Sequence, residues 1–438
     1  MQAANSPVEA VARVREALPA QGLFADKEWL FSPEPFVLEE GMEEEFEKLG
    51  HRLNLFNRAC NQLYQLSAQG RQPRWVADYL DRGKPPELVE FARQKGLRDE
   101  IPGIIRPDVI LTESGYTIAE LDAVPGGIGL TAWLNRTYSD LGAEVIGGRD
   151  GMIEGFSSIL PGGDIVLSEE AATYGPEMRW LADQLNATSG NGSRWEVRDT
   201  SLSTDFQRNV YRFFELFDLP NIASARFLME AVGRGELRVT PPFKPYIEEK
   251  IWFALFWLRP LHEFWRRELG ERHWLKLQEV IPYTWIVDPA PLPQHAVIPR
   301  LEINRWEELG SFSQKHRELL LKISGFSDLA WGSRGISLGQ DMPQAEWKAA
   351  VANAVAEFET HPYVLQQFHK GKLVRQPFLD VSKNEMSVMH GRVRLCPYYF
   401  VIEDKAKLRG VLATVCPPDK KFLHGMKDAI LVPCSAAA

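Results

Sequence analysis

Residues 108–131 read DVILTESGYTIAELDAVPGGIGLT, and the interpretation of the whole chain starts from this stretch. Two strand-like runs flank the turn-forming pair Ser114-Gly115, which predicts a β-hairpin. In its second strand Glu120 and Asp122 lie two positions apart, so both carboxylates leave the same face. Acids inside an apolar strand need a partner. With a glycine turn just beyond them, the pair predicts a Mg²⁺ site completed by phosphate oxygens, and the alternative is a solvent-exposed strand face.

A lysine followed by a glycine-rich loop is the second candidate feature. Lys322 lies within the apolar run 319–323, and the loop 325–339 that follows contains glycines at 325, 332, 335 and 339. Backbone N–H groups of such a loop can cover a polyphosphate while the lysine neutralises its charge. The alternative is an edge-strand lysine that guards against aggregation. Lys250, Arg334 and Arg394, taken singly, fit surface positions as well as a site.

A competing motif lies in the same opening stretch. Gly127-Ile-Gly129-Leu-Thr-Ala132 matches the GxGxxA dinucleotide fingerprint, and Glu144 follows at a later position. Pro125 interrupts the turn, however, and the acids of the preceding strand would place negative charge near a pyrophosphate. A nicotinamide-dependent oxidoreductase is therefore kept as an alternative.

Composition narrows the class of protein. The 438 residues allow two to four structural units at roughly 100–200 residues per domain. A formal charge of −9, with no cluster of Lys and Arg, argues against a nucleic-acid partner. The most apolar run, 251–258, is far shorter than the roughly 20 residues that cross a membrane. Without a signal-peptide pattern, and with four scattered cysteines, we expect a cytoplasmic protein with no membrane partner.

The motifs, in their order along the chain, resemble those of the ATP-grasp superfamily. The stretch 108–131 resembles its metal-binding strand, which carries Glu-x-Asn before Pro-Gly. In most of the superfamily that motif comes last, whereas here it precedes the lysine strand at 322. This order resembles the circularly permuted branch, the eukaryotic-type glutathione synthetases and glutathionylspermidine-synthetase-like proteins. Three further segments resemble the first-lysine stretch, the adenine hinge and the closing segment, namely 239–252, 361–368 and 408–434.

The resemblance implies an α/β fold with α+β elements: an ATP-grasp unit of permuted motif order plus a Rossmann-like substrate lobe. Residues 160–240, where strand-like and helix-like pieces alternate, would form that lobe, and their alternation independently favours a parallel sheet. The other expected segments are a mostly helical region at 1–105, metal-binding strands at 106–150, a first-lysine subdomain at 241–310 and a second-lysine subdomain at 311–438.

The same resemblance implies the site and its cofactors, ATP and Mg²⁺. The metal ligands would be Glu120, Asp122 and Asp328. The transferring phosphoryl group would be steadied by Arg334 or Arg394. The nucleotide would be bound by a larger set: Lys250, Lys322, Gly332, Gly335, Gln366, Gln367 and Phe368.

The function expected from the resemblance is a carboxylate–amine ligase that acts through an acyl phosphate on small-molecule substrates. A homodimer is left open as its quaternary state. Asp122 stands where the superfamily has asparagine, and Gln366 and Gln367 stand where a hinge acid is common. The closing strand reads Gly410-Val-Leu-Ala-Thr414 and lacks the arginine that binds glycine in glutathione synthetases, which argues against glutathione as the product. A non-catalytic nucleotide-binding protein is the second alternative.

Overall fold

The computed structural model describes residues 6–19, 23, 28–188, 194–199, 201, 203–330, 332, 334–424 and 427–437. A seven-stranded sheet has the order β1-β15-β14-β13-β2-β3, and β12 pairs with β13 beside this path. Its strands are β1 (Phe36–Val37), β2 (Ile104–Thr112), β3 (Gly115–Asp122), β12 (Leu373–Asp380), β13 (Glu385–Ile402), β14 (Lys405–Cys416) and β15 (Ile430–Ser435). All pairings are antiparallel except that of β1 with β15.

The predicted hairpin is confirmed as β2 and β3. These strands pair antiparallel, with Asp108 opposite Glu120 and Arg106 opposite Asp122. The register shifts between Asp108 and Val109, as a β-bulge does. The carboxylates of the hairpin therefore gather at the end of β3 that leads into the glycine turn.

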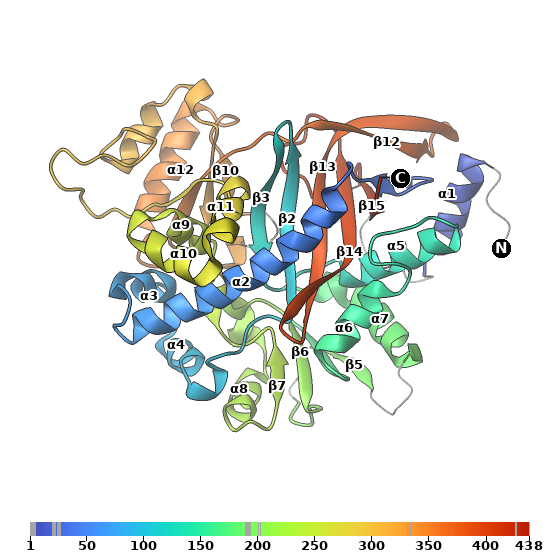
Figure 1. Ribbon diagram of the computed structural model, residues 1–438, viewed down its shortest axis with the longest axis horizontal. Helices are drawn as coiled ribbons and strands as arrows, with labels where there is room; N and C mark the ends of the chain where they lie inside the picture. Colours follow the sequence, from blue (N-terminus) through green and yellow to red (C-terminus); the bar gives the residue numbers. More distant parts are fainter. Residues whose placement is uncertain are drawn as a thin grey trace.

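Helices cover both faces of the large sheet. Tyr399 and Phe400 are consecutive in β13, so their side chains point to opposite faces. The Tyr399 ring packs on Gly50 of α2 (Met42–Ala68), where an added Cβ would come within 2.4 Å of the ring. The Phe400 ring packs in the same way on Gly155 of α6 (Gly151–Ile159). Figure 1 shows the long helix α2 running across β2, β13 and β14.

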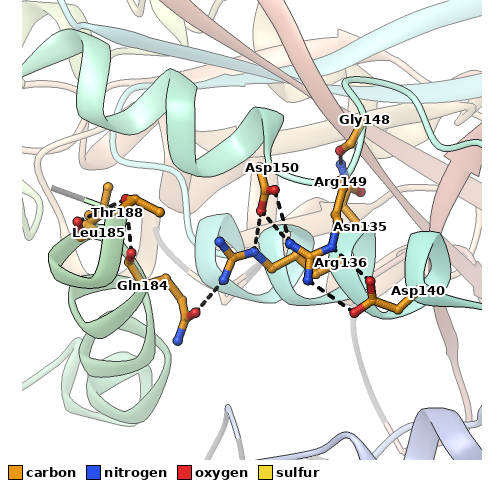
Figure 2. A network of polar contacts seen from close by, with 9 residues as sticks. All are labelled: Asn135, Arg136, Asp140, Gly148, Arg149, Asp150, Gln184, Leu185 and Thr188. Atoms are coloured by element: carbon orange, nitrogen blue, oxygen red, sulfur yellow. Dashed lines mark hydrogen bonds and ion pairs between the residues drawn. The ribbon is translucent and has the colours of Figure 1, made fainter. Parts of the chain in front are cut away.

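The helices on the α6 side are joined by a polar network. Arg136 of α5 (Ile128–Asp140) donates to Asp150 at 2.6 Å and to Gln184 of α7 (Gly175–Thr188). Arg149 bridges Asp140 and Asp150, as Figure 2 shows. Arg136 of α5 thus connects α7 with Asp150, the residue that precedes α6.

Two smaller sheets complete the architecture. An antiparallel sheet has the order β10-β9-β11-β8, formed by β8 (Thr284–Ile286), β9 (Leu319–Ile323), β10 (Ile336–Leu338) and β11 (Tyr363–Gln367). A parallel sheet has the order β5-β4-β6-β7, formed by β4 (Gly163–Leu167), β5 (Trp195–Arg198), β6 (Asn209–Phe213) and β7 (Arg238–Thr240). In Figure 1 the antiparallel sheet lies beside β3, near the label β10, and the parallel sheet lies below it, near β6 and β7. The mixed α/β class expected from the sequence is confirmed.

The remaining helices pack around these sheets. They are α1 (Pro7–Glu16), α3 (Arg74–Asp81), α4 (Pro86–Ala92), α8 (Ala225–Gly233), α9 (Ile251–Trp257), α10 (His262–Leu269), α11 (Glu271–Val280) and α12 (Gln344–Ala356). In the part of the chain that the structure describes, no helix combines the length and the apolar character needed to cross a bilayer.

A buried arginine joins the parallel sheet to the segment that leads into α9. The Arg212 side chain is 1% exposed and forms an ion pair with Glu248 at 2.6 Å. It also donates to the carbonyl oxygens of Pro241 and Pro242. Because Glu248 lies two residues before Lys250, this contact fixes where α9 begins relative to β6.

Replacing Arg212 with methionine is expected to lower the free energy of unfolding by about 3–5 kcal/mol, because Glu248 would stay buried without its partner. Chemical denaturation measures the change. The matched control is Arg226→Met, since that side chain is 91% exposed and its pair with Glu230 should contribute well under about 1 kcal/mol. Equal effects for the two variants would contradict a role for Arg212 in holding the segment.

Candidate functional site

Two lysines and one carboxylate, distant in sequence, meet between the large sheet and the antiparallel sheet. Lys250 precedes α9, and its Nζ lies 2.8 Å from Oε1 of Glu120 in β3. Lys322 of β9 donates to the carbonyl oxygen of Ala119 at 3.1 Å and to Oε1 of Gln366 at 2.8 Å. These five residues therefore form one connected group.

The local pattern of the small sheet explains why Lys322 and Gln366 face the same way. Lys322 pairs with Val364 and Gln366 pairs with Leu320, so the two polar side chains are diagonal neighbours on one face. The amide of Gln366 also donates to Thr284 of β8 at 3.4 Å. The face that carries them is the one directed at β3.

Electrostatics separate the two lysines. The pKa of Lys322 is lowered to about 8, chiefly because burial disfavours its charge. Repulsion from Lys250 adds to this decrease, and attraction to Glu120 offsets part of it. For Lys250, burial also opposes the charge, but Glu120 and Glu215 outweigh it and hold the pKa above its usual value. Lys322 is thus a cation of the kind that an anionic ligand would stabilise.

These residues line two adjoining cavities. The smaller contains Glu120, Lys250, Lys322 and Gln366 among its walls. The larger has about 1320 Å³ of non-atom space, part of it open to solvent. It is lined by Gln366 and Gln367 at the end of β11 and by Phe368 after it. Its walls also carry five lysine or arginine residues, Lys322, Lys370, Arg392, Arg394 and Lys421, and four acidic residues, Asp108, Glu120, Glu318 and Asp419. An ion pair between Lys421 and Asp341 connects the closing segment to the end of β10 beside the cavity.

A second buried network lies at the base of the hairpin. Arg106 contacts Asp122 at 2.7 Å and Asp108 at 3.1 Å, and Arg394 contacts Asp108 at 2.9 Å. Burial favours the neutral form of Asp108, but Arg394 and Arg106 outweigh it and lower its pKa. For Asp122, burial dominates and raises the pKa despite Arg106, with Glu120 and Asp108 adding to the rise.

The predicted metal ligands have three different surroundings. Glu120 faces the cavities and Asp122 is held by Arg106, whereas Asp328 is exposed and is absent from the linings of both cavities. Among the described residues, no three His, Cys, Asp or Glu side chains are arranged to hold a metal ion. Mg²⁺ usually takes only one or two carboxylates plus phosphate oxygens. The donors present therefore fit a magnesium ion that arrives with a triphosphate and contacts Glu120.

The residues predicted to contact the nucleotide and the phosphoryl group also fall into two sets, those that line the cavities and those that do not. Lys250, Lys322, Gln366, Gln367, Phe368 and Arg394 line the cavities. Gly332 and Gly335 do not appear among the lining residues, and Arg334 forms an ion pair with Glu170 beside the parallel sheet. Lys250 also donates to the carbonyl of Ala330 at 3.2 Å, which ties the glycine loop to the group. Positions 331 and 333 of that loop lie outside the described residues.

Sequence reasoning missed Arg106 and Asp108. The signal was present, because the run Ile104-Ile-Arg-Pro-Asp-Val-Ile110 places two charges in an otherwise apolar strand. It also missed Arg392 and Lys421 in the cavity wall, which no local pattern distinguishes from surface residues.

In the competing dinucleotide motif, a side chain of the protein itself takes the place of a bound pyrophosphate. Gly127 precedes α5 with φ +83, and the N–H groups of Gly129 and Leu130 donate to Oε1 of Glu177 at 2.8 and 3.1 Å. A buried carboxylate therefore fills the position that a pyrophosphate would take at this helix N-terminus. The strand before it belongs to an antiparallel hairpin, which is not the βαβ unit of that fingerprint.

Fold and site together define a mixed α/β protein with a cavity, lined by charged residues of both signs, between the large sheet and the smaller antiparallel sheet. No protein-family model and no curated protein matches the sequence. A glutathione synthetase-like effector from Globodera pallida matches with a TM-score of 0.56, over 99% of this chain and 98% of its own, at 10% identity. The chain therefore has a glutathione synthetase-like fold. A structure from Methylobacillus flagellatus, provisionally assigned as a gamma-glutamylcysteine synthetase, covers 85% of this chain and 86% of its own at 14% identity, with a TM-score of 0.41.

The buried charge of Lys322 predicts a measurable cost to stability. Its pKa of about 8 lies below its value in the unfolded chain, so the folded state gives up this proton first as the pH rises. The cost of the buried charge is complete below pH 8 and fades as the pH rises toward about 10.5. Lys322→Met should raise the melting temperature at pH 7, and the gain should shrink as the pH rises above 8.

Thermal melts from pH 7 to pH 10 measure this difference. Lys405→Met, at an exposed position, is the control and should show no pH-dependent gain. A Lys322→Met variant that is less stable than the parent at pH 7, by the same amount at every pH, would contradict the assignment.

Proposed function

We propose that this protein is an ATP- and Mg²⁺-dependent carboxylate–amine ligase with an ATP-grasp site of permuted motif order. The observation that carries the proposal is the meeting of Glu120, Lys250 and Lys322 at one cavity. Three charged residues that lie far apart in the chain gain little from burial together unless a ligand compensates their desolvation. A triphosphate with its magnesium ion would do so.

In this proposal the larger cavity holds the nucleotide. Gln366, Gln367 and Phe368 would form the edge that meets adenine, and Lys250 and Lys322 would neutralise phosphate charge. Glu120 would exchange its contact with Lys250 for the magnesium ion. Arg394 lines the cavity and pairs with Asp108, and its guanidinium group would also orient an anionic substrate group.

When bound, ATP would supply a phosphoryl group to the substrate carboxylate. In the proposed reaction a carboxylate oxygen would bond to the γ-phosphorus as ADP leaves, and the amine nitrogen would then bond to the acyl carbon as phosphate leaves and the nitrogen loses a proton. In this proposal the chain's own part would be positioning and charge neutralisation. This work depends on electrostatics, so single contacts should matter strongly.

Two variants test the proposal through nucleotide binding and turnover. Lys322→Met should weaken ATP–Mg²⁺ binding about 10- to 100-fold, since it removes a charged hydrogen-bond donor. Glu120→Ala should lower amine-dependent phosphate release about 10²- to 10³-fold. Calorimetric titration and a phosphate-release assay with pooled carboxylates and amines provide the measurements, with Lys405→Met as the control. Phosphate release that is unchanged in Glu120→Ala would refute the assignment.

The alternatives give different results in the same assays. A nicotinamide-dependent oxidoreductase would be thermally stabilised by NADH, whereas the ligase would be stabilised by ATP–Mg²⁺ alone. A non-catalytic nucleotide-binding protein would bind ATP with the same dependence on Lys322. It would release no phosphate with any substrate pool.

A further inference from the structure

A separate small cavity lies at the carboxyl ends of β4 and β6. It has about 280 Å³ of non-atom space, part of it open to solvent. Strands of a parallel sheet bring their carboxyl ends to one edge, and that edge is where open α/β sheets bind ligands. Val124, which follows β3, also lines the cavity. Because Glu120 is four residues from Val124, the cavity is within about 14 Å of the candidate nucleotide site.

The walls of this cavity are acidic and aromatic. Its carboxylates are Glu170, Glu215 and Asp218, and its aromatic rings are Phe213, Phe214 and Phe217. Of the described residues that line it, none is a lysine or an arginine. Glu170 is already paired with Arg334, which leaves Glu215 and Asp218 to face a ligand.

Asp218 provides the structural evidence for a ligand at this cavity. It is 4% exposed, and only its Oδ1 accepts a hydrogen bond, from Asn221 at 2.7 Å. Its Oδ2 atom has no hydrogen-bond partner among the described residues. A buried carboxylate oxygen without a partner is costly, so a donor that is part of no described residue would stabilise it.

Glu215 contributes a further carboxyl group to the wall of the same cavity. The residue is half-buried. Burial raises the pKa of Glu215 well above its usual range, and Glu248 raises it further while Lys250 opposes the rise. A bound cation would restore the charged form of this carboxyl group.

We propose that this cavity binds the ammonium group of a cationic amine, with Asp218 and Glu215 as its acceptors and Phe217 as an aromatic wall. An ammonium ion supplies three donors and suits both carboxylates and ring faces. A divalent metal fits less well, because the described residues contain no group of three metal ligands. An amine with its own carboxylate, such as glycine, would be repelled by the acidic walls.

This inference deepens the proposed ligase and rests on it only for the role of the amine. If the protein is a ligase, the cavity selects an acceptor that carries positive charge without an adjacent carboxylate. The binding site itself stands independently of ATP. The two claims can therefore fail separately.

Ligand-observed NMR in the absence of ATP tests the site by measuring the binding of n-butylamine, glycine and butyrate. We expect binding by n-butylamine and at least tenfold weaker binding by the other two. Asp218→Asn and Glu215→Gln should each weaken n-butylamine binding about 10- to 100-fold, and Asp218→Asn should leave the affinity for ATP–Mg²⁺ unchanged. Asp183→Asn, at an exposed position of α7, is the matched control and should change neither.

The outcomes separate the site from the proposed function. Unchanged n-butylamine binding in both cavity variants, or equal binding of glycine or butyrate, would overturn the inference. Mg²⁺ that binds more tightly than n-butylamine and competes with it would also overturn it. Amine binding that depends on Asp218, in a protein that binds no ATP, would keep the site and reject the ligase. Lys322→Met should reduce ATP affinity and keep amine binding, which completes the comparison.

Discussion

The contact between Glu120 and Lys250, extended to Lys322, is the interaction on which the central architecture depends. Two lysines buried between two sheets repel each other and lose hydration, and each effect alone opposes folding. Glu120 supplies the opposite charge within 2.8 Å of Lys250, and backbone and amide oxygens satisfy Lys322. Residues of the large sheet, the antiparallel sheet and the start of α9 therefore meet in one charged group.

Other buried ion pairs neutralise the acidic side chains that lie near this group. Arg106 and Arg394 neutralise the acids at the base of the hairpin, and Arg212 neutralises Glu248 just before Lys250. The two cavities near β3 differ in chemistry. The larger carries five lysine or arginine residues together with four acidic ones, and the smaller, lined by Val124 beyond the end of β3, carries carboxylates and aromatic rings.

The extent of prediction from sequence can be judged at individual residues. The hairpin, the strand around Lys322 and the strand at 363–367 followed from apolar runs and turn residues, which act over a few positions. The partners of Asp122 and Arg334 did not, because Arg106 and Glu170 are ordinary charged residues until the chain folds. A glutathione synthetase-like protein has a similar fold at only 10% sequence identity. A fold can therefore persist when most of the individual side chains differ.

By itself the sequence determined the mixed α/β class, the hairpin at its centre and the positions of Glu120, Lys250 and Lys322 within their elements, because period and turn chemistry are local. Only the tertiary structure decided which charges meet. It filled the glycine motif at 127–129 with the Glu177 carboxylate, and it left Oδ2 of Asp218 without a described partner at the edge of a parallel sheet. Such pairings depend on contacts between residues dozens to hundreds of positions apart, which no short-range pattern encodes.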